Sequence, residues 1–284
     1  MNGAAAGHFG WARDLWRLRM GTVHTVVNQK GGVGKTTTAV NVAACLAQAG
    51  RRVLLIDLDP QGNATSGVGI DKNSLAQIGR GAQKSTYEVL IDGLPAAEAV
   101  QDTVVPGLRM LPANIDLAGA EIELIMRESR ETLVRDCIGP VVADYDYVIL
   151  DAPPSLGLLT LNSLVAADYA IVPIQCEYYA LEGVSQLMKT VELVKRRLNP
   201  DLEIGLVILT MYDNRVRLAQ QVVAEVRKAF GPKVARTIIP RNVRLSEAPS
   251  HGLPVTVYDP RSRGAQAYRD IAQEIMRYGE AGAR

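Results

Sequence analysis

Cysteine is scarce in this chain, with three residues among 284. Cys45, Cys137 and Cys176 lie far apart and form no C-x-x-C pair, so the pattern typical of a zinc site or a metal-cluster site is missing. Isolated cysteines of this kind are most often small buried hydrophobic side chains. We therefore expect a cytoplasmic protein, kept in a reducing environment, without a metal cluster.

Long apolar segments are missing as well. No run approaches the ~20 apolar residues that a membrane-spanning helix requires, so we expect a soluble protein that does not enter the membrane. With 48% hydrophobic residues in 284, the chain is long enough for one sizeable core. Strand patterns alternate with helix patterns, which predicts a single-domain α/β protein with a mainly parallel, twisted sheet and helices on both faces. The expected helices span residues 36–48, 117–126, 130–138, 158–165, 181–198, 217–230 and 265–278, and the polar, glycine-rich stretch 67–85 predicts a surface loop.

A glycine-rich turn joins the first predicted strand to the first predicted helix. Residues 22–28 form a β-branched apolar strand, and residues 36–48 place apolar side chains at helical spacing. Glycines in such a turn allow successive backbone N–H groups and the positive end of the helix dipole to face phosphate oxygens. This order of elements predicts a phosphate-binding loop and therefore a P-loop NTPase.

Two side chains of this loop have assignable chemistry. Lys35 is expected to reach the β- and γ-phosphates of ATP, and Thr36 to supply a hydroxyl ligand for Mg²⁺. The predicted ATP-binding loop comprises Gln29, Lys30, Gly31, Gly32, Val33, Gly34, Lys35, Thr36 and Thr37.

The loop departs from the usual G-x-x-x-x-G-K-[ST] pattern at its start. Gln29 occupies the position of the first glycine, and Lys30 adds a second cation. Lys30 is badly placed for the phosphates of its own site but can extend toward the nucleotide of a neighbouring subunit. We therefore predict a homodimer with two facing nucleotide sites, in which Lys30 acts as a catalytic residue alongside Lys35.

Two further apolar strands end in carboxylates. Asp57 and Asp59 follow residues 53–56, and Asp151 ends the apolar run 147–150. Ligands bind at the carboxyl ends of strands in open α/β sheets, so these side chains are expected at the nucleotide site. We predict that Asp57 and Asp151 serve the metal ion, and that Asp59 is the catalytic residue that orients the attacking water. A lone aspartate at a strand end is more often a turn or cap residue, and the succession of three motifs is what favours catalysis.

The net charge of +1 conceals an uneven distribution. Residues 189–263 contain 14 Lys/Arg and 7 Asp/Glu, so the rest of the chain is acidic overall. A stripe of these basic side chains would neutralise phosphates and bind DNA without sequence preference. An ordinary solvated surface explains the same surplus, and charge alone leaves both interpretations open. The side chains concerned include Lys195, Arg196, Arg197, Arg215, Arg217, Arg241, Arg244, Arg261 and Arg263.

Several sequence blocks together resemble the short, single-domain ParA/Soj family of chromosome-partition ATPases. These blocks are QKGGVGKTTT, DLDPQGNATSG, LDAPPSLGLLTLNSL, QCEYYALEG, LTMYDNR, and IPRNVRLSEAPSHG with YDPRSRGAQAY. The resemblance covers residues 20–278, and its last four blocks are not shared by P-loop ATPases in general.

The resemblance implies a Mg²⁺-dependent ATPase that forms a homodimer with ATP, binds double-stranded DNA non-specifically and associates with the nucleoid. It implies a partner of the ParB/Spo0J type that binds centromeres and stimulates slow ATP hydrolysis, so that a chromosome or plasmid is segregated. Arg215 and Arg244 match the DNA-contacting arginines of the family. No helix-turn-helix pattern precedes the ATPase region, so sequence-specific DNA reading is not expected.

The same C-terminal blocks are expected to line the adenine pocket. Met211, Tyr212 and Asp213 follow the predicted strand 204–210. Pro240 and Asn242 follow residues 235–239, which we also predict to be a strand. Backbone groups at these two strand ends are then positioned to contact the base.

Two alternatives concern the ends of the chain. A MinD-like membrane switch shares the phosphate loop, and that resemblance implies a basic amphipathic tail, whereas residues 265–284 mix acidic and basic side chains and predict a docked helix. Residues 1–19 lie outside the predicted ATPase domain at 20–284 and lack the features of a signal peptide. Trp11, Leu15 and Leu18 share a helical face there, which favours a short amphipathic helix touching a membrane or partner; a disordered extension, or a translation start at Met20, is the simpler interpretation.

Overall fold

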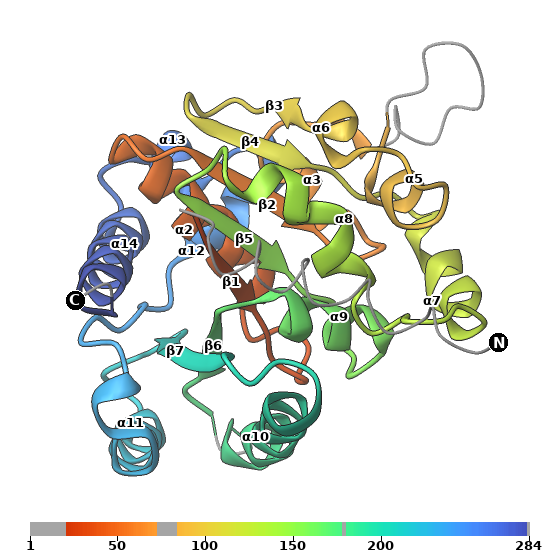
Figure 1. Ribbon diagram of the computed structural model, residues 1–284. Coiled ribbons are helices and arrows are strands. Elements are labelled where there is room, and N and C mark those ends of the chain that lie inside the picture. The colour runs from red at the N-terminus through yellow and green to blue at the C-terminus, as the bar shows by residue number, and fades with distance from the viewer. Residues whose placement is uncertain (1–20, 73–83, 178–179, 283–284) are drawn as a thin grey trace, which may run out of the picture.

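The computed structural model describes residues 21–72, 84–177 and 180–282 (Figure 1). The extension predicted for residues 1–19 lies outside these ranges, as does most of the predicted loop 67–85. The described beginning of that loop does not lie wholly on the surface as predicted, because Val68 and Ile70 are buried.

Within the described ranges, a seven-stranded sheet forms the centre of the molecule (Figure 1). Its strand order is β3-β4-β2-β5-β1-β6-β7, and neighbouring strands are parallel except for β3 with β4. The predicted α/β fold with a mainly parallel sheet is therefore confirmed. The strands span Thr22–Val26 (β1), Val53–Asp57 (β2), Gln101–Asp102 (β3), Leu108–Leu111 (β4), Tyr147–Asp151 (β5), Tyr169–Gln175 (β6) and Glu203–Thr210 (β7).

Helices flank this sheet on both sides (Figure 1). Each predicted helix is present: the helix at 217–230 has the predicted ends, and the others differ at one or both ends. The longer helices span Lys35–Gln48 (α2), Leu117–Ile125 (α7), Leu133–Val142 (α8), Leu158–Ala166 (α9), Ala180–Arg197 (α10), Arg217–Phe230 (α11) and Arg263–Gly282 (α14). The shorter ones span Asn63–Ser66 (α3), Thr86–Leu90 (α5), Ala96–Ala99 (α6), Val243–Glu247 (α12) and Val255–Tyr258 (α13), with 3-10 turns at Gly231–Lys233 and Ala248–His251.

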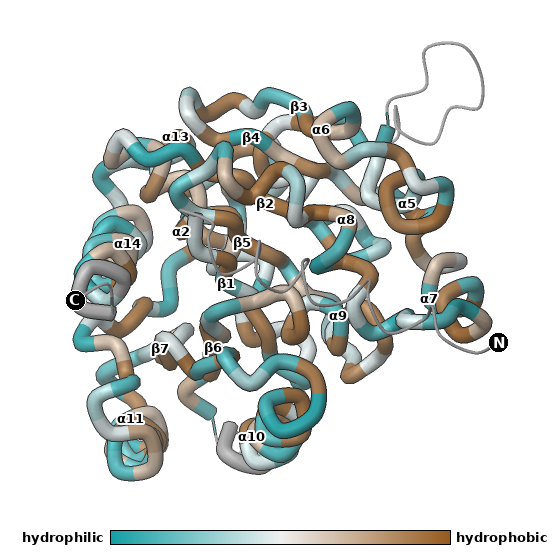
Figure 2. Tube along the Cα trace, viewed as in Figure 1, coloured by the Kyte–Doolittle hydropathy of each residue, from teal (hydrophilic) through white to brown (hydrophobic). Residues whose placement is uncertain are grey.

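The central strands are buried on both faces, as a parallel sheet covered by helices requires. Leu54 and Ile56 of β2 belong to one core, whereas Val53 and Leu55 belong to the other. Helices α5, α7, α8, α9, α10 and α11 supply apolar side chains to the first core, and α2 and α14 supply them to the second. Figure 2 shows the apolar residues concentrated along β2 and β5 between these two layers.

The prediction of a strand at residues 235–239 is wrong. This segment runs beside β7 and donates from the Ala235 and Ile239 N–H groups to it, but only isolated bridges flank it. The N–H groups of Arg236 and Thr237 donate instead to the Glu274 carboxylate of α14, over 2.8 and 2.9 Å. A side chain distant in sequence therefore takes the donors that a strand ladder would need. Strands β3, β4 and β6 were not predicted from the sequence.

Candidate nucleotide-binding site

The glycine-rich turn lies between β1 and α2, as predicted. Gly34 caps α2 with a φ of 91°, and Gly32 has a φ of 76°, so both occupy the left-handed region that favours glycine. No side chain caps this helix end, and its first turn contains no acidic residue. The backbone N–H groups at the start of α2 are thus available to an anion.

Two side chains that sequence reasoning missed hold this loop in place. Asn28 donates to the Pro173 carbonyl of β6 over 2.7 Å and accepts from the Lys30 N–H over 3.0 Å. Thr210, at the end of β7, donates to the Val33 carbonyl over 2.9 Å. The loop is therefore anchored to β6 and β7 through contacts that join residues remote in sequence.

The two lysines of the loop have different surroundings. Lys35 is 7% exposed, and its Nζ lies 3.4 Å from the Lys30 carbonyl. Burial lowers the Lys35 pKa, although the charges of Asp151 and Asp59 act in the opposite direction. The Lys30 side chain is half-buried and forms only a loose ion pair, 3.8 Å from Glu177. Lys35 is thus directed into the site, while Lys30 remains able to reach outward.

Asp57 and Asp151 lie side by side at the ends of neighbouring strands. They are register partners of β2 and β5, and both are fully buried. Asp57 accepts hydrogen bonds from the Asp59 N–H (3.0 Å), the Thr65 N–H (2.9 Å) and the Thr65 hydroxyl (2.8 Å). Burial raises the pKa of Asp57 to about 6 despite these donors.

Asp151 differs from Asp57 because both of its carboxylate oxygens are buried without a hydrogen-bond partner in the described chain. The Asp151 pKa is raised well above its usual range, chiefly by burial and next by the nearby Asp57 charge. The nearby Thr36 hydroxyl lowers the Asp151 pKa and so offsets part of this rise. Its contact with the Asp151 carboxylate does not have the geometry of a hydrogen bond. A buried carboxylate without partners favours a cation as its missing neighbour.

Asp59 lies next to this pair and is 8% exposed. One of its oxygens accepts the Gln61 N–H over 2.9 Å, and its own N–H binds Asp57. The carboxylate is therefore held on a turn at the end of β2, on the same sheet edge as Lys35.

The expected adenine-pocket residues follow β7. Met211 has a φ of 53°, unusual for a residue other than glycine, and Tyr212 is bridged to Pro240. These two segments are therefore side by side, and their contact with adenine stays a prediction. The side chains of Asp213 and Asn242 are already engaged: Asp213 accepts from Arg215, and Asn242 caps α12 by accepting the Arg244 N–H over 2.8 Å.

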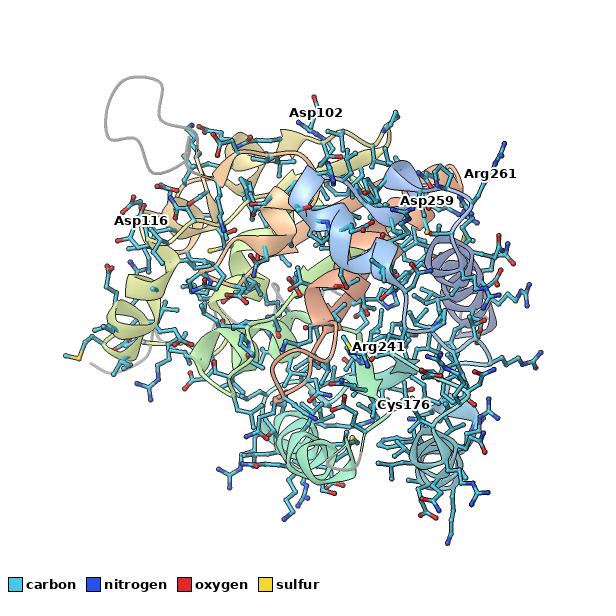
Figure 3. All side chains as sticks on the ribbon, turned by 180° about the vertical axis from the view of Figure 1, so that it is seen from behind. Asp102, Asp116, Cys176, Arg241, Asp259 and Arg261 are labelled. Atoms are coloured by element: carbon cyan, nitrogen blue, oxygen red, sulfur yellow. The ribbon has the colours of Figure 1, made fainter. Side chains whose placement is uncertain are left out.

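The two expected DNA-binding arginines each face carboxylates. Arg215, whose side chain is 85% exposed, donates to Asp213 from Nε and Nη2 over 2.9 and 2.6 Å, and holds the Asp213 pKa at about 2. Arg244 donates to Glu247 over 2.7 Å and lies 3.2 Å from Asp259. Figure 3 labels Asp259 and shows Arg261, which lies near it, pointing into solvent. The role of both arginines in DNA binding stays a prediction.

No group of three or more His, Cys, Asp or Glu side chains suited to a metal occurs within residues 21–72, 84–177 and 180–282. The pair Asp57 and Asp151 nevertheless suits a Mg²⁺ ion, because Mg²⁺ retains several waters and binds one or two carboxylates together with substrate phosphates.

In the described part of the chain, no helix combines the length and apolarity needed to cross a membrane.

These features define a P-loop NTPase, and a family model described as an AAA domain matches residues 21–204. The chain is 55% identical over 260 residues to the sporulation initiation inhibitor protein Soj of Bacillus subtilis, a match covering 92% of this chain and 100% of that protein. It is 50% identical over 271 residues to the chromosome partitioning protein ParA of Myxococcus xanthus, covering 95% and 91%. The chain belongs to the ParA/Soj family of chromosome-partitioning ATPases.

A solved structure adds information on ligands. Cobyrinic acid a,c-diamide synthase from Mycobacterium smegmatis, with bound ADP and magnesium, is 40% identical, with a TM-score of 0.79 over 93% of this chain and 97% of that one. The same enzyme has also been solved with an ATP analogue and magnesium. Structural relatives thus bind adenine nucleotide and magnesium, which agrees with the expected ligands.

Proposed function

We propose that the chain is a Mg²⁺-dependent ATPase that dimerises with ATP, binds DNA non-specifically and segregates a chromosome or plasmid. The observation that carries the nucleotide part is the pair of unpartnered Asp151 oxygens, buried beside Lys35 and Asp57. A metal ion and phosphates at this place would supply the missing opposite charges. Family membership supports the role in partitioning.

The ligand residues follow from this arrangement. Lys35 and the N–H groups of residues 31–37 bind the phosphates, and Thr36 with Asp151 holds the magnesium ion. Asp57, whose oxygens already accept three hydrogen bonds, acts on the water shell of the ion. Bound magnesium neutralises charge on the transferred phosphoryl group. The segments at Met211–Asp213 and at Pro240 with Asn242 contact the base.

Hydrolysis in this proposal depends on two further side chains. Asp59 positions the attacking water from its turn at the end of β2, and Lys30 extends to the nucleotide of the second subunit. Hydrolysis is slow until a ParB/Spo0J-type partner stimulates it. Arg215 and Arg244 bind DNA phosphates in the ATP-bound dimer, which places the protein on the nucleoid.

A MinD-like membrane switch is less well supported, because the C-terminal helix is docked. Tyr268 of α14 is buried, with its hydroxyl 3.1 Å from that of Thr38 in α2. Glu274 of the same helix binds two backbone N–H groups beside β7. A helix held on its inner face in this way is not a free amphipathic membrane anchor.

The test is to measure binding of non-specific DNA with ATP, with ADP and without nucleotide, in parallel with flotation on anionic liposomes. We expect DNA retention only with ATP and no flotation in any state. Flotation with ATP and no DNA retention would establish the membrane switch instead. Equal DNA binding in all three states would overturn the nucleotide-gated proposal.

A further inference from the structure

Asn41 joins the phosphate-loop helix to the C-terminal part of the chain. This side chain of α2 is 4% exposed. Its Nδ2 group donates to the Thr37 carbonyl over 2.8 Å, and its Oδ1 atom accepts the Val255 N–H over 2.7 Å. Because a backbone N–H can only donate, the Val255 contact fixes the orientation of the amide. Asn41 therefore ties the first turn of α2 to a residue far away in the sequence.

Val255 begins α13, a short helix whose far end holds Arg244. Helix α13 lies against α2 (Figure 1). Asp259, which follows α13, donates its N–H to the Val255 carbonyl over 2.9 Å, and its carboxylate lies 3.2 Å from Arg244. Tyr258 donates to Glu247 over 3.3 Å, and the same Glu247 oxygen accepts from Arg244. The position of α13 therefore decides how the Arg244 side chain is held.

A second contact links the same segment to the other side of the nucleotide site. Gly252, between α12 and α13, has a φ of 66°. A Cβ there would lie 3.2 Å from the Ser66 carbonyl oxygen, so the segment lies closely against the end of α3. Thr65 of α3 donates twice to Asp57. Residues 243–259 therefore contact two helices, one that starts at the phosphate loop and one that is bonded to a buried carboxylate of the site.

We propose that Asn41 is a positioning residue that transmits the nucleotide state from α2 to Arg244. This inference deepens the proposed function and rests on its nucleotide and DNA sites. Phosphates bound at the N-terminus of α2 act on its first turn, and the Thr37 contact passes a shift of that turn to Asn41. The Val255 contact passes the shift to α13. With ATP, the hold on Arg244 is thereby weakened, and the guanidinium is free to bind a DNA phosphate.

Helix α13 is suited to take a second position. It has only four residues, and Thr256, the second of them, is 4% exposed. The Thr256 hydroxyl is buried without a hydrogen-bond partner in the described chain, and such a group costs free energy. A position of α13 in which this hydroxyl finds a partner recovers that cost. A modest preference of ATP for that position is therefore enough to populate it.

The test compares the DNA affinity of the full chain with Mg²⁺ and a non-hydrolysable ATP analogue to its affinity with Mg²⁺ and ADP. Coupling between two sites typically changes affinity by about 5–150-fold. Asn41→Ala should lower the ratio of the two affinities by roughly fivefold or more, while nucleotide affinity without DNA and ATP-dependent dimerisation remain. Coupling is reciprocal, so DNA should also raise the affinity for the ATP analogue less in this variant.

A second variant removes the same hydrogen bond from its other end. Val255→Pro deletes the donor at the first position of α13, where a helix tolerates proline. Pro254 already has a ψ of 149°, the extended backbone that precedes proline. The variant should lower the affinity ratio as Asn41→Ala does.

Tyr268→Phe is the matched control. It removes the buried 3.1 Å contact between the Thr38 and Tyr268 hydroxyls, which also joins α2 to the C-terminal part of the chain but leads to α14 and not to α13. Its thermal stability should fall as in Asn41→Ala, and its affinity ratio should stay at the wild-type value. An equal fall of the ratio in this control would assign the effect to a general loosening of α2 and overturn the inference.

The remaining outcomes separate this inference from the proposed function. A wild-type ratio in both Asn41→Ala and Val255→Pro, while Arg244→Ala still weakens DNA binding, overturns the role of Asn41 alone. Loss of nucleotide binding in Asn41→Ala would assign Asn41 to the nucleotide site itself and also overturn that role. A wild-type chain that binds no DNA with the ATP analogue, or unchanged affinity in Arg244→Ala, overturns the proposed DNA site and this inference with it.

Discussion

The nucleotide edge of the sheet and the arginine-bearing surface hold their charges in opposite ways. At the nucleotide edge, Asp57 and Asp151 are fully buried, and burial raises both pKa values. On the other surface, Arg215 and Arg244 are exposed, and each faces carboxylates of the same chain. Burying a charge costs free energy unless a ligand supplies the opposite charge. An exposed ion pair contributes little to stability, and its members readily take other partners.

From this difference we expect two kinds of binding. The nucleotide edge is preorganised, since its unpartnered groups define where opposite charge must bind. The arginine surface is adaptable, because its side chains can leave Asp213 or Glu247 for a phosphate at small cost. Four predictions test this contrast, beginning with the largest expected effect.

Asp59→Ala should reduce ATP hydrolysis by roughly 10²–10⁴-fold, the range seen when a positioned acid or base is removed. ATP affinity should remain, because the phosphate loop and Lys35 are unchanged. Steady-state phosphate release together with equilibrium binding of a fluorescent ATP analogue would measure both quantities. Wild-type turnover in this variant would show that Asp59 does not orient the water.

Lys35→Ala should weaken ATP binding by about 100-fold or more, because charged hydrogen bonds to the phosphates are lost. Lys30→Ala is the matched control. Its half-exposed side chain forms only a 3.8 Å pair with Glu177, so its loss should spare ATP affinity and impair hydrolysis. Titration with the fluorescent analogue distinguishes the two variants. Equal affinity losses would contradict the different roles assigned to the two lysines.

The nucleotide-free protein should lose stability as the pH rises from about 4 to about 6. Burial raises the Asp57 pKa to about 6, so over this interval the folded chain retains a proton that the unfolded chain has released. The full shift corresponds to about 3 kcal/mol, and the raised Asp151 pKa acts in the same direction. Urea unfolding across this pH interval would measure the slope, which Asp57→Asn should reduce.

Asp146→Asn provides a control of the opposite sign. Hydrogen bonds from Arg52 lower the Asp146 pKa, so this exposed pair contributes stability that is lost as the pH falls. The variant should leave the loss of stability between about pH 4 and 6 in place. If Asp57→Asn has no more effect on that slope than Asp146→Asn, the buried carboxylate is not its source.

Arg215→Ala and Arg244→Ala should each weaken DNA binding alike at all sequences and take about 0.9 off the slope of log affinity against log salt. ATP-dependent dimerisation should remain. Arg52→Ala is a matched control, because Arg52 is also exposed and paired with an aspartate, Asp146. DNA titrations at several salt concentrations would measure the slopes. Equal losses in all three variants would indicate a general charge effect without a defined binding surface.

Much of the fold could be predicted from local sequence patterns, and the errors in that prediction have identifiable causes. The phosphate loop, β2, β5 and the longer helices were predicted because periodicity and glycine positions are local properties. Residues 235–239 were predicted as a strand, but Glu274 of α14 takes two of the donors that a strand would use. Nothing near residues 235–239 in the sequence indicates that contact.

The site shows the same limit. Asn28 and Thr210 anchor the phosphate loop through contacts with carbonyl groups distant in sequence, and the sequence assigned neither residue a role. The pairing of Arg244 with Asp259 likewise depends on how α12 packs near the end of α13. The roles of Asn28 and Thr210 and the Arg244–Asp259 contact were missed because they arise from packing between segments far apart in the chain.

The sequence by itself determined the class of this protein, because a phosphate loop requires glycines, a lysine and a hydroxyl at fixed spacing between a strand and a helix. Only the tertiary structure decided which charges are buried. Asp57 and Asp151 are far apart in the chain, and the pairing of β2 with β5 places them together away from water. Burial depends on what surrounds a residue in space, so the raised pKa values and the unpartnered Asp151 oxygens follow from the fold and not from the motif.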